Sequence, residues 1–364
     1  MEDADPFAPE GRPLRRGWTT GACATAATKA ALAALLQGAF EDPVTITLPG
    51  GQTPAFALAH ERRGPAFAEA GIIKDAGDDP DVTHGALVFS NVTAGVAGSG
   101  VTFHAGEGVG TVTKPGLPLG VGEPAINPVP RRMMREVVEA ASAVAGVPPD
   151  FALTISVRDG ALLAEKTWNP RLGILGGLSI LGTTGIVVPY SCAAWIASIQ
   201  RGVDVARAMG LAHVVGSTGD ASEKAAMARL GLPIEAYLDM GDFVGGLLKY
   251  LRVHPVERVT IAGGFAKLVK LAQGAMDLHS ARSTVDLETL AGLLAGAGGD
   301  AALVEQARRA NTANEVLGLA LAAGLPLADV VAQAARRSAR DMLRGTMEVS
   351  VLVVDRGGQI VGEA

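Results

Sequence analysis

Glycine and proline recur between residues 106 and 131, where the chain reads GEGVGTVTKPGLPLGVGEPAINPVPR, too closely for a helix or a strand to persist. Glycine adopts backbone angles that other residues avoid, and proline fixes its own φ. We therefore predict a shaped loop in this segment. Four side chains in the loop carry charged or hydrogen-bonding groups that could contact a ligand, namely Lys114, Glu123, Asn127 and Arg131. Binding groups concentrate on loops held by a rigid scaffold, so this loop is the first candidate site.

This loop resembles the signature of the cobalt-precorrin-5B (C1)-methyltransferases of anaerobic cobalamin biosynthesis. Five further segments agree with that family in the same order along the chain: RGWTTGACA at 16–24, KDAGDDPDVT at 74–83, GGLSILGTTGIV at 176–187, GDFVG at 241–245 and KLVKLA at 267–272. The resemblance spans residues 14–350. The sequence departs from the family pattern at Trp18, Ala22 and Gly120, where Tyr, Thr and Pro are expected.

The resemblance implies that S-adenosylmethionine donates a methyl group to carbon C1 of cobalt-precorrin-5B, which gives cobalt-precorrin-6A. The sulfonium already activates its methyl group, so the protein's main task would be in-line positioning, and no catalytic triad is expected. Cobalt would arrive within the substrate, and we expect no metal bound by the protein itself. The acetate and propionate groups of the macrocycle would attract arginine and lysine.

Bulk composition narrows the class of protein. A chain of 364 residues with 48% hydrophobic and 19% charged residues predicts two globular domains. A net charge of −6 argues against nucleic acid or an anionic membrane as a partner. The two cysteines, Cys23 and Cys192, form no CxxC pair or disulfide framework, which suits a cytoplasmic protein. Self-association and transient contact with neighbouring pathway enzymes both stay open.

One uncharged stretch, 172–200, is long enough to span a bilayer. Its glycines, its Ser and Thr residues and Pro189 favour a glycine loop followed by a buried helix instead. Residues 1–13 are acidic and rich in Pro and Gly, without the basic start of a signal peptide, and we interpret them as a flexible leader.

Sequence patterns predict an α+β domain at 14–178 followed by a Rossmann-like α/β domain at 179–364, with a mostly parallel sheet. The boundary is expected within 169–185. In the first domain we predict helices at 22–37, capped by Thr20, and at 130–145, with strands at 44–48, 54–60, 65–73, 86–92 and 101–104, and a hairpin pairing 152–157 with 161–167. In the second we predict strands at 212–215, 234–238 and 258–261, helices at 220 onward (capped by Asp220), 243–251, 265–275, 287–294, 302–323 and 327–344, and a terminal hairpin of 348–354 with 359–361.

The basic groups of the first loop are candidate substrate ligands. Arg131 and its neighbour Arg132 lie in the first turn of a predicted helix, where positive charge opposes the helix dipole unless an anion binds. Lys114, between Thr113 and Pro115, is the other cation. Glu123 and Asn127 could bind ring amides or hold these cations in place. We assign Asn127 as a substrate ligand and Glu123 as a candidate catalytic residue.

Two further groups of polar residues are candidates for the same site. Residues 74–83 form an acidic loop, with four aspartates around Gly77 and Pro80. Within it Asp75 and Asp78 could orient Lys74 or Lys114, or contact the ring nitrogens or the sulfonium; the alternative is a solvated turn. We assign Asp78 as a candidate catalytic residue and Asp75 as a substrate ligand. Thr19 with Thr20, and Thr183 with Thr184, offer hydroxyl groups beside glycine, although helix capping explains Thr20 equally well.

For the methyl donor, the pattern of the second domain suggests a glycine turn after one strand and an acidic residue after the next. Gly216, Gly219 and Asp239 fit that arrangement, and Gly263 with Gly264 offers a second turn. The motif is not GxGxxG, so it is a weak signal.

Two other functions remain open at this point. A non-catalytic protein that binds or delivers tetrapyrroles would use the same basic loop without a donor. A phosphate-ester enzyme would use the Gly/Thr loops, but the lysine of a Walker motif is missing.

Overall fold

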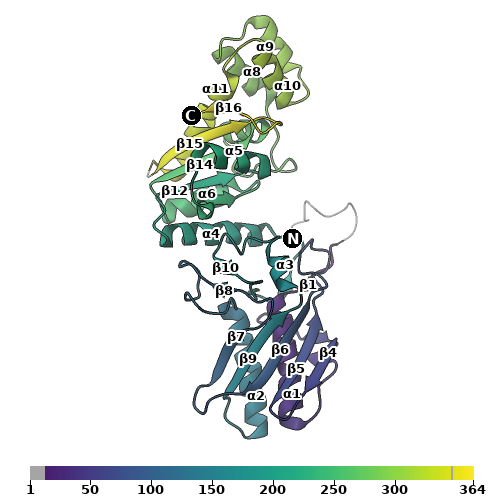
Figure 1. The fold of residues 1–364 in the computed structure, drawn as a ribbon. Coiled ribbons are helices and arrows are strands. Elements are labelled where there is room, and N and C mark those ends of the chain that lie inside the picture. Colours follow the sequence, from purple (N-terminus) through teal and green to yellow (C-terminus); the bar gives the residue numbers. More distant parts are fainter. Residues whose placement is uncertain (1–12, 346) are drawn as a thin grey trace. The chain divides into compact units, whose positions relative to one another are not determined.

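The computed structural model describes residues 13–345 and 347–364 (Figure 1). Nearly all of the predicted leader, 1–13, lies outside the described residues. The chain divides into two compact units, Met1–Ser191 and Cys192–Ala364. The sequence places the division earlier, after residue 178. The strands at 174–175 and 186–187 pair with strands near residues 111 and 17, and this pairing keeps the segment in the first unit.

The first unit contains three helices and eleven strands among its described residues. Its helices are α1 (Thr20–Gln37), α2 (Pro128–Ala145) and α3 (Gly160–Ala164); its strands are β1 (Gly17–Trp18), β2 (Val44–Thr45), β3 (Ala55–Phe56), β4 (His60–Arg63), β5 (Phe67–Ile73), β6 (Leu87–Ala94), β7 (Val101–Ala105), β8 (Thr111–Val112), β9 (Phe151–Val157), β10 (Ile174–Leu175) and β11 (Ile186–Val187).

A five-stranded sheet in the order β4-β5-β6-β9-β7 forms the body of this unit. Its neighbouring strands are antiparallel except β7 and β9, which run parallel. Alternate residues of β9 are buried, as expected when one face of a sheet meets a core. Helices α1 and α2 pack together, with α1 against β5 and β6.

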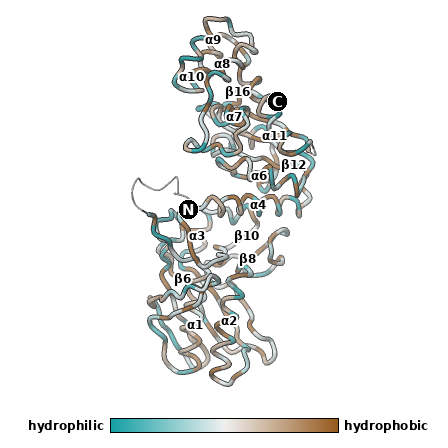
Figure 2. The backbone as a smooth tube through the Cα atoms, turned by 180° about the vertical axis from the view of Figure 1, so that it is seen from behind, coloured by the Kyte–Doolittle hydropathy of each residue, from teal (hydrophilic) through white to brown (hydrophobic). Residues whose placement is uncertain are grey.

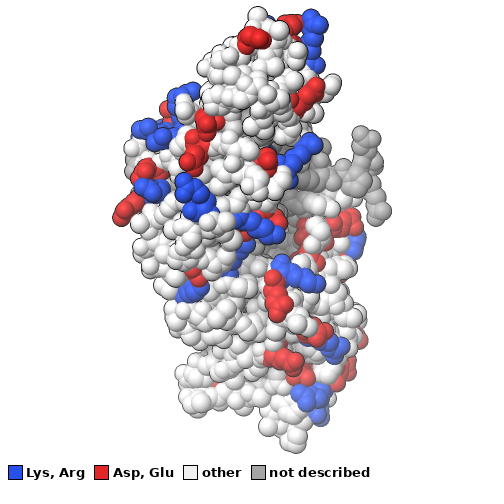
Figure 3. All heavy atoms as spheres, turned by 45° about the horizontal axis from the view of Figure 1, so that its top comes forward, with Lys and Arg blue, Asp and Glu red and all other residues white. Residues whose placement is uncertain are grey.

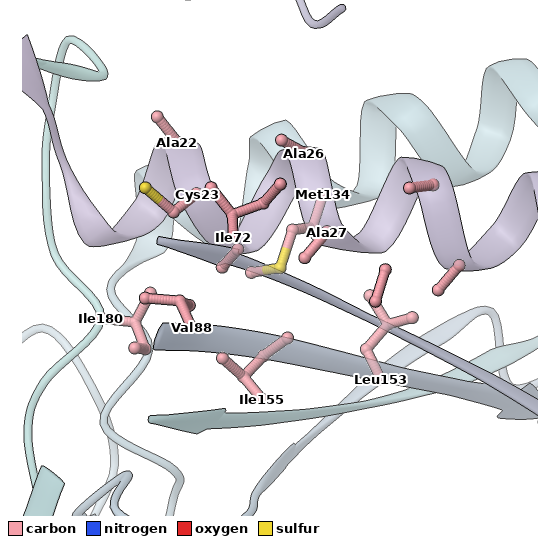
Figure 4. Packing of buried hydrophobic residues seen from close by; sticks show 14 of the residues in the cluster. Ala22, Cys23, Ala26, Ala27, Ile72, Val88, Met134, Leu153, Ile155 and Ile180 are labelled. Carbon is pink, nitrogen blue, oxygen red and sulfur yellow. The ribbon is translucent and has the colours of Figure 1, made fainter. Parts of the chain in front are cut away.

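Helix α1 is rich in alanine and almost wholly buried. Figure 4 shows Ala22, Cys23, Ala26 and Ala27 of this helix beside Ile72, Val88 and Leu153 of the sheet. Alanine ends in a single methyl group, so the helix can lie close to both the sheet and α2. Cys23 is part of this packing, and burial raises the pKa of its thiol to about 12.

The structure corrects three local predictions in the first unit. The cap of α1 is Thr19, whose Oγ1 accepts from the Ala22 amide, not Thr20. The segment after β9 is helix α3, not the second strand of a hairpin, since Ala161, Leu162 and Leu163 are strong helix formers. Of the strand predicted at 44–48, β2 covers only Val44–Thr45, although the Ile46 and Leu48 amides still donate to the Pro54 and Gln52 carbonyls. Both long helices do end at left-handed glycines, Gly38 and Gly146, as their sequences indicate.

The second unit alternates strands and helices. Its helices are α4 (Cys192–Ala208), α5 (Asp220–Leu230), the 3₁₀ turn η1 (Ile234–Ala236), α6 (Val244–Val253), α7 (Phe265–Ala272), α8 (Leu287–Gly296), α9 (Ala301–Arg308), α10 (Ala313–Ala322) and α11 (Leu327–Leu343); its strands are β12 (His213–Ser217), β13 (Tyr237–Asp239), β14 (Arg258–Gly264), β15 (Glu348–Val354) and β16 (Ile360–Glu363).

These strands form a mixed sheet in the order β13-β12-β14-β15-β16. The first four are parallel and β16 runs antiparallel to β15. Successive strand residues point to opposite faces: Val215 packs in a cluster with Ala226 of α5, whereas Gly216 lies against Leu247 of α6. Helices therefore cover both faces. In Figure 2 hydrophobic and hydrophilic residues alternate along the elements of both units.

Two predictions in the second unit need correction. The long helix predicted at 302–323 is split into α9 and α10, because Thr312 caps a new helix by accepting from the Glu315 amide. Helix α5 is capped by Gly219, and the Asp220 carboxylate instead pairs with Lys224 at 2.8 Å. In residues 13–345 and 347–364, no helix has both the length and the apolar character needed to cross a membrane.

Candidate functional site

Backbone hydrogen bonds join the predicted loop at 106–131 to the segment 173–187. Gly110 donates to the Leu178 carbonyl at 2.8 Å, Ala125 donates to Gly110 at 2.8 Å, and residues 126 and 180 form a bridge. We call these two segments the loop layer. Gly177 is required in it, since a methyl group there would overlap the backbone of Gly108. The layer is therefore closely packed backbone and not a loose surface loop.

Arg131 holds part of the loop layer in place. Its Nε donates to the Ile126 carbonyl at 2.7 Å and its Nη2 to the Pro124 carbonyl at 3.0 Å. Its Nη1 lies 2.7 Å from Glu123 Oε2, and its guanidinium lies over the Phe103 ring at 5.5 Å. The side chain of Arg131 is only 15% exposed. These contacts make Arg131 a structural clamp, and they place Glu123 beside it.

The other groups of this loop lie in the same assembly. The Val112 amide donates to the Glu123 carbonyl at 3.0 Å, and Lys114 follows Val112 by two residues. The stem of Lys114 packs over Gly173, where a Cβ would come within 2.5 Å of its Cγ. Asn127 precedes α2 without making a side-chain cap. The structure thus pairs Glu123 with Arg131, whereas the side chain of Lys114 packs over Gly173 in the same loop layer.

The start of α2 offers few donors to an anion. Pro128 and Pro130 have no N–H, and the Arg131 amide already donates to Asn127. Only Val129 contributes an N–H from the first three residues of the helix. The adjacent Arg132 is largely exposed and lies 3.7 Å from Glu136. An anion at this helix end would depend on side chains more than on the backbone.

The two Thr-containing turns meet. The Thr19 amide donates to the Gly185 carbonyl at 3.0 Å, and the Gly21 amide donates to Leu181 at 3.1 Å. Because the Ala22 amide also donates to Thr19 Oγ1, the first turn of α1 has little N–H capacity left for a ligand. Thr20 is buried, whereas Thr183 and Thr184 are exposed on the opposite turn.

The acidic loop is organised around Arg15, a residue that the sequence patterns did not single out. The Arg15 guanidinium pairs with both oxygens of Asp75, one at 2.8 Å, and the Arg15 amide donates to Asp78 Oδ2 at 2.7 Å. The hydrogen bonds from Arg15, followed by one from the Gly77 amide, lower the pKa of Asp75 to about 2. In return, the Asp78 amide donates to the Arg15 carbonyl at 2.9 Å. Asp75 and Asp78 therefore bond Arg15 and not Lys74.

Lys74 is instead paired with Asp81. Lys74 is 3% exposed, and its ammonium bonds both Asp81 and Thr83. Burial acts to raise the pKa of Asp81, but the charge of Lys74 and the hydrogen bonds from Lys74 and Thr83 outweigh it and leave the pKa lowered. Burial raises the pKa of Asp79, which accepts from the Tyr190 amide at 2.8 Å. The aspartates of the acidic loop are thus held by hydrogen bonds and ion pairs within the protein.

A second candidate lies at the carboxyl ends of the parallel strands in the second unit. A cavity of about 310 Å³ is lined by the first residues of α5 and α7, together with the end of β15; we call it the switch crevice. It lies where the strand order reverses, between β12 and β14, a position at which open α/β sheets bind ligands. Its lining residues include Gly219, Ser222, Gly264, Lys267, Asn314, Asp355 and Arg356.

The glycines predicted for the donor divide into two groups. Gly219 and Gly264 line the crevice, and a Cβ at either would meet nothing within 4 Å. Gly216 and Gly263 lie within strands, where Gly216 makes room for Leu247 of α6 and Gly263 for Leu268 of α7. Asp239 ends β13, accepts from the Gly241 amide at 3.2 Å, and is not among the crevice residues.

Several crevice residues escaped the sequence analysis. Lys267 donates to the Thr218 carbonyl at 2.8 Å and lies 3.0 Å from Asp242. Asp355 and Arg356 belong to the turn between β15 and β16, which the sequence marks only as a hairpin. Their relevance depends on β15 lying beside β14, which no local pattern reveals.

The electrostatics of the described residues are mixed. Figure 3 shows acidic and basic side chains interspersed over the face in view. Residues 13–345 and 347–364 contain no group of three or more His, Cys, Asp or Glu side chains arranged to hold a metal ion.

Comparison with known proteins shows the family of this chain. The family model described as CbiD matches residues 8–189, and that described as CbiD, C-terminal domain, matches 277–364. A protein of Rhodospirillum rubrum named cobalt-precorrin-5B C(1)-methyltransferase is 65% identical over 100% of this chain and 99% of its own. A protein of the same name from Paramagnetospirillum magneticum is 62% identical over 96% of this chain and 98% of its own.

A crystal structure of the cobalamin biosynthesis protein cbiD from Archaeoglobus fulgidus is also similar, with 29% identity, 74% of this chain and 83% of that chain covered, and a TM-score of 0.40. The loop layer and the switch crevice define a two-unit protein of mixed α/β fold with a candidate ligand site in each unit. This chain belongs to the CbiD family.

Proposed function

We propose that this protein transfers a methyl group from S-adenosylmethionine to C1 of cobalt-precorrin-5B, giving cobalt-precorrin-6A. The observation that carries the proposal is the 65% identity, over the whole chain, to the cobalt-precorrin-5B C(1)-methyltransferase of Rhodospirillum rubrum. Cobalt belongs to the substrate in this reaction. The protein's contribution is to bind both reactants and to aim the sulfonium methyl at one ring carbon.

The donor's place in this proposal is the switch crevice, in a Rossmann-like unit. Neither α5 nor α7 has a side-chain cap, so their first N–H groups are available to a carboxylate such as that of the donor's methionine part. Open space before Gly219 and Gly264 permits an approach to the backbone. Asp355 supplies a carboxylate that can accept from ribose hydroxyls, a role that the sequence suggested for Asp239.

The macrocycle's place is the loop layer of the first unit. Lys114 and the exposed Arg132 provide positive charge, and Asn127, Thr183 and Thr184 provide polar contacts. In this proposal Arg131 acts mainly by holding Glu123 and the loop in position. Thr19 and Asp75 act in the same indirect way, through α1 and Arg15.

Glu123 and Asp78 are the candidate groups for chemistry on the ring, and Glu123 is the better placed. Its side chain is 45% exposed, so it can reach a ligand while it pairs with Arg131. Asp78 is occupied by the Arg15 amide. Cys23 takes no part, because its buried thiol has a pKa of about 12 and stays protonated at neutral pH.

The test is a reaction with purified protein, cobalt-precorrin-5B and S-adenosylmethionine labelled in its methyl group. We expect the label to appear in the macrocycle, at C1, with release of S-adenosylhomocysteine. Tight binding of the macrocycle without transfer of the label, and without measurable affinity for the donor, would instead identify a tetrapyrrole carrier.

A further inference from the structure

Two of the sequence motifs, GDFVG at 241–245 and KLVKLA at 267–272, have no role in the proposed reaction so far. The structure joins them by an ion pair. Asp242 Oδ1 of the first motif lies 3.0 Å from Lys267 Nζ of the second. Lys267 lines the switch crevice, whereas Asp242 does not. The carboxylate can therefore influence the crevice only through the lysine.

The Asp242 carboxylate is largely enclosed. Its side chain is 23% exposed, and Oδ1 is sealed from solvent. In the described part of the chain no group meets this oxygen with hydrogen-bond geometry, so the Lys267 ammonium is what compensates its charge. Burial lowers the pKa of the neighbouring Lys270, and the charge of Asp242 opposes this shift. One carboxylate therefore lies within electrostatic reach of two lysines.

Lys267 has a second partner, in the lining of the crevice. Its ammonium donates to the Thr218 carbonyl at 2.8 Å. The Thr218 amide donates to the Ala262 carbonyl at 3.0 Å, so both backbone groups of Thr218 are bonded. Because a peptide group is planar, the bond from Lys267 fixes the link between Thr218 and Gly219, directly before α5 begins. The position of the lysine thus bears on the start of α5.

The charges of the crevice balance when their ion-pair partners are counted. Four charged residues line it, two of each sign: Asp220, Lys267, Asp355 and Arg356. Asp220 has its partner in Lys224, at 2.8 Å, and Lys267 has its partner in Asp242. Neither partner lines the cavity. Without the carboxylate of Asp242, this set of charges would be left with one net positive charge.

This balance matters for a ligand that is itself a cation. S-adenosylmethionine carries a carboxylate, an ammonium and a sulfonium, and so has one net positive charge at neutral pH. S-adenosylhomocysteine lacks the methyl group and the sulfonium charge, and is neutral overall. An uncompensated lysine in the crevice would repel the sulfonium, whereas the neutral thioether would not be affected in this way.

We propose that Asp242 is a positioning residue of the donor site, which lets the switch crevice accept a cationic donor by compensating Lys267 and holding it against the Thr218 carbonyl. The identity of the donor and its place in the crevice rest on the proposed function. The new element is the role of the GDFVG and KLVKLA motifs in selecting the charge of the ligand.

The test compares two ligands that differ by one methyl group and one charge. Calorimetry gives the dissociation constants of S-adenosylmethionine and S-adenosylhomocysteine for the full-length protein and for Asp242→Asn, which keeps the size of the side chain and removes its charge. We expect Asp242→Asn to weaken binding of S-adenosylmethionine about tenfold more than binding of S-adenosylhomocysteine. This is the scale of one unit charge acting over roughly 8 Å, the width of a cavity of this volume, at an effective dielectric constant of about 30.

Substitution of Lys267 separates charge from shape. Lys267→Gln alone leaves Asp242 uncompensated, so the ratio of the two affinities should shift in the opposite direction, toward S-adenosylmethionine. Lys267→Gln combined with Asp242→Asn removes both charges, and the ratio should return to within about twofold of that of the unchanged protein. Loss of the bond to Thr218 lowers both affinities in the double variant and leaves their ratio unaffected.

Asp204→Asn is the matched control. Asp204 is similarly enclosed and lies 3.0 Å from Arg201, and neither residue lines the crevice. This variant should leave the ratio unchanged. Equal weakening of both ligands in Asp242→Asn would show a purely structural role and overturns the proposal. A ratio that does not recover in the double variant overturns it too, and so does a shift of the same size in Asp204→Asn.

The result is separable from that of the methyl-transfer assay. Label transfer at C1 with an affinity ratio indifferent to Asp242 and Lys267 would remove this role and keep the function. A ratio that depends on Asp242, without label transfer, would keep the charge selection and remove the function. If neither ligand binds the unchanged protein, the donor site is refuted and this role with it.

Discussion

In the loop layer of the first unit, Gly108 and Gly177 lie against each other's backbone, whereas in the switch crevice of the second unit Gly219 and Gly264 face open space. The charged groups follow the same division. Arg131 and Asp75 are already bonded within the first unit, and α5 and α7 begin without side-chain caps in the second. Glycine in the first region permits close packing of a rigid loop. Glycine in the second leaves backbone donors accessible.

The difference between the two regions can be tested most directly by replacing one glycine with alanine in each. Gly177→Ala should lower the free energy of unfolding of the first unit by about 3 kcal/mol, because the Cβ would overlap the backbone of Gly108. Gly264→Ala should cost at most about 1 kcal/mol, the difference between Gly and Ala as a helix cap. Urea unfolding of both variants measures this, and equal losses would refute the division.

The crevice can be tested by charge reversal. Arg356→Glu should weaken binding of S-adenosylhomocysteine about tenfold in calorimetry, since it places a carboxylate beside a site proposed to bind one. Arg337→Glu, on the exposed side of α11, is the control and should have little effect. An unchanged affinity in the first variant would move the donor elsewhere.

A substitution at Arg131 distinguishes a residue that holds the loop in place from one that binds the macrocycle directly. Arg131→Ala should lower the free energy of unfolding by about 2 kcal/mol, because two carbonyls and Glu123 lose their partner. Arg132→Ala should change it by less than about 0.5 kcal/mol, as is usual for an exposed ion pair. If Arg131→Ala lowers macrocycle affinity and leaves stability intact, the residue is a direct ligand.

The smallest expected effect concerns the Arg15–Asp75 pair. The folded-state pKa of Asp75 is about 2, below its ordinary value of 3.8. Because the unfolded state binds this proton more tightly, the pair contributes fully above about pH 4, and its contribution is lost as the pH falls toward 2. Half-exposure of both side chains screens the effect. Asp75→Asn should flatten the stability profile in that window, and Arg15→Ala should flatten it less, because the Gly77 amide still lowers the pKa of Asp75. A profile that stays unchanged in Asp75→Asn would show that other groups titrate there.

Features governed by neighbouring residues were predictable from sequence. Gly38 and Gly146 end their helices because only glycine adopts the left-handed backbone there easily. The strand–turn–helix order of the second unit follows from the same kind of local pattern. Where local signals compete, prediction failed: Asp159-Gly160 suggests a tight hairpin, but the helix formers that follow it produce α3.

Features governed by distant residues were not predictable. Arg15 meets Asp75 sixty positions later, and β15 lies next to β14 across eighty-three intervening residues, from 265 to 347. Because β15 pairs with β14, Asp355 and Arg356 line the same cavity as Gly219 and Gly264. Sequence patterns grouped Lys114, Glu123 and Arg131 because one continuous loop holds them, and the structure shows a contact between two of these residues, Glu123 and Arg131. No local pattern shows that the Arg131 guanidinium turns back to bond the loop's own carbonyls.

The burial of Cys23 has a practical consequence for labelling chemistry. With a thiol pKa of about 12, Cys23 holds almost no thiolate at neutral pH, so maleimides and similar electrophiles have little to attack there. Cys192 is the other cysteine of the chain, partly accessible, and it is the first residue of the second unit. A single dye or spin label can therefore be attached at the junction of the two units without first engineering out a competing sulfur.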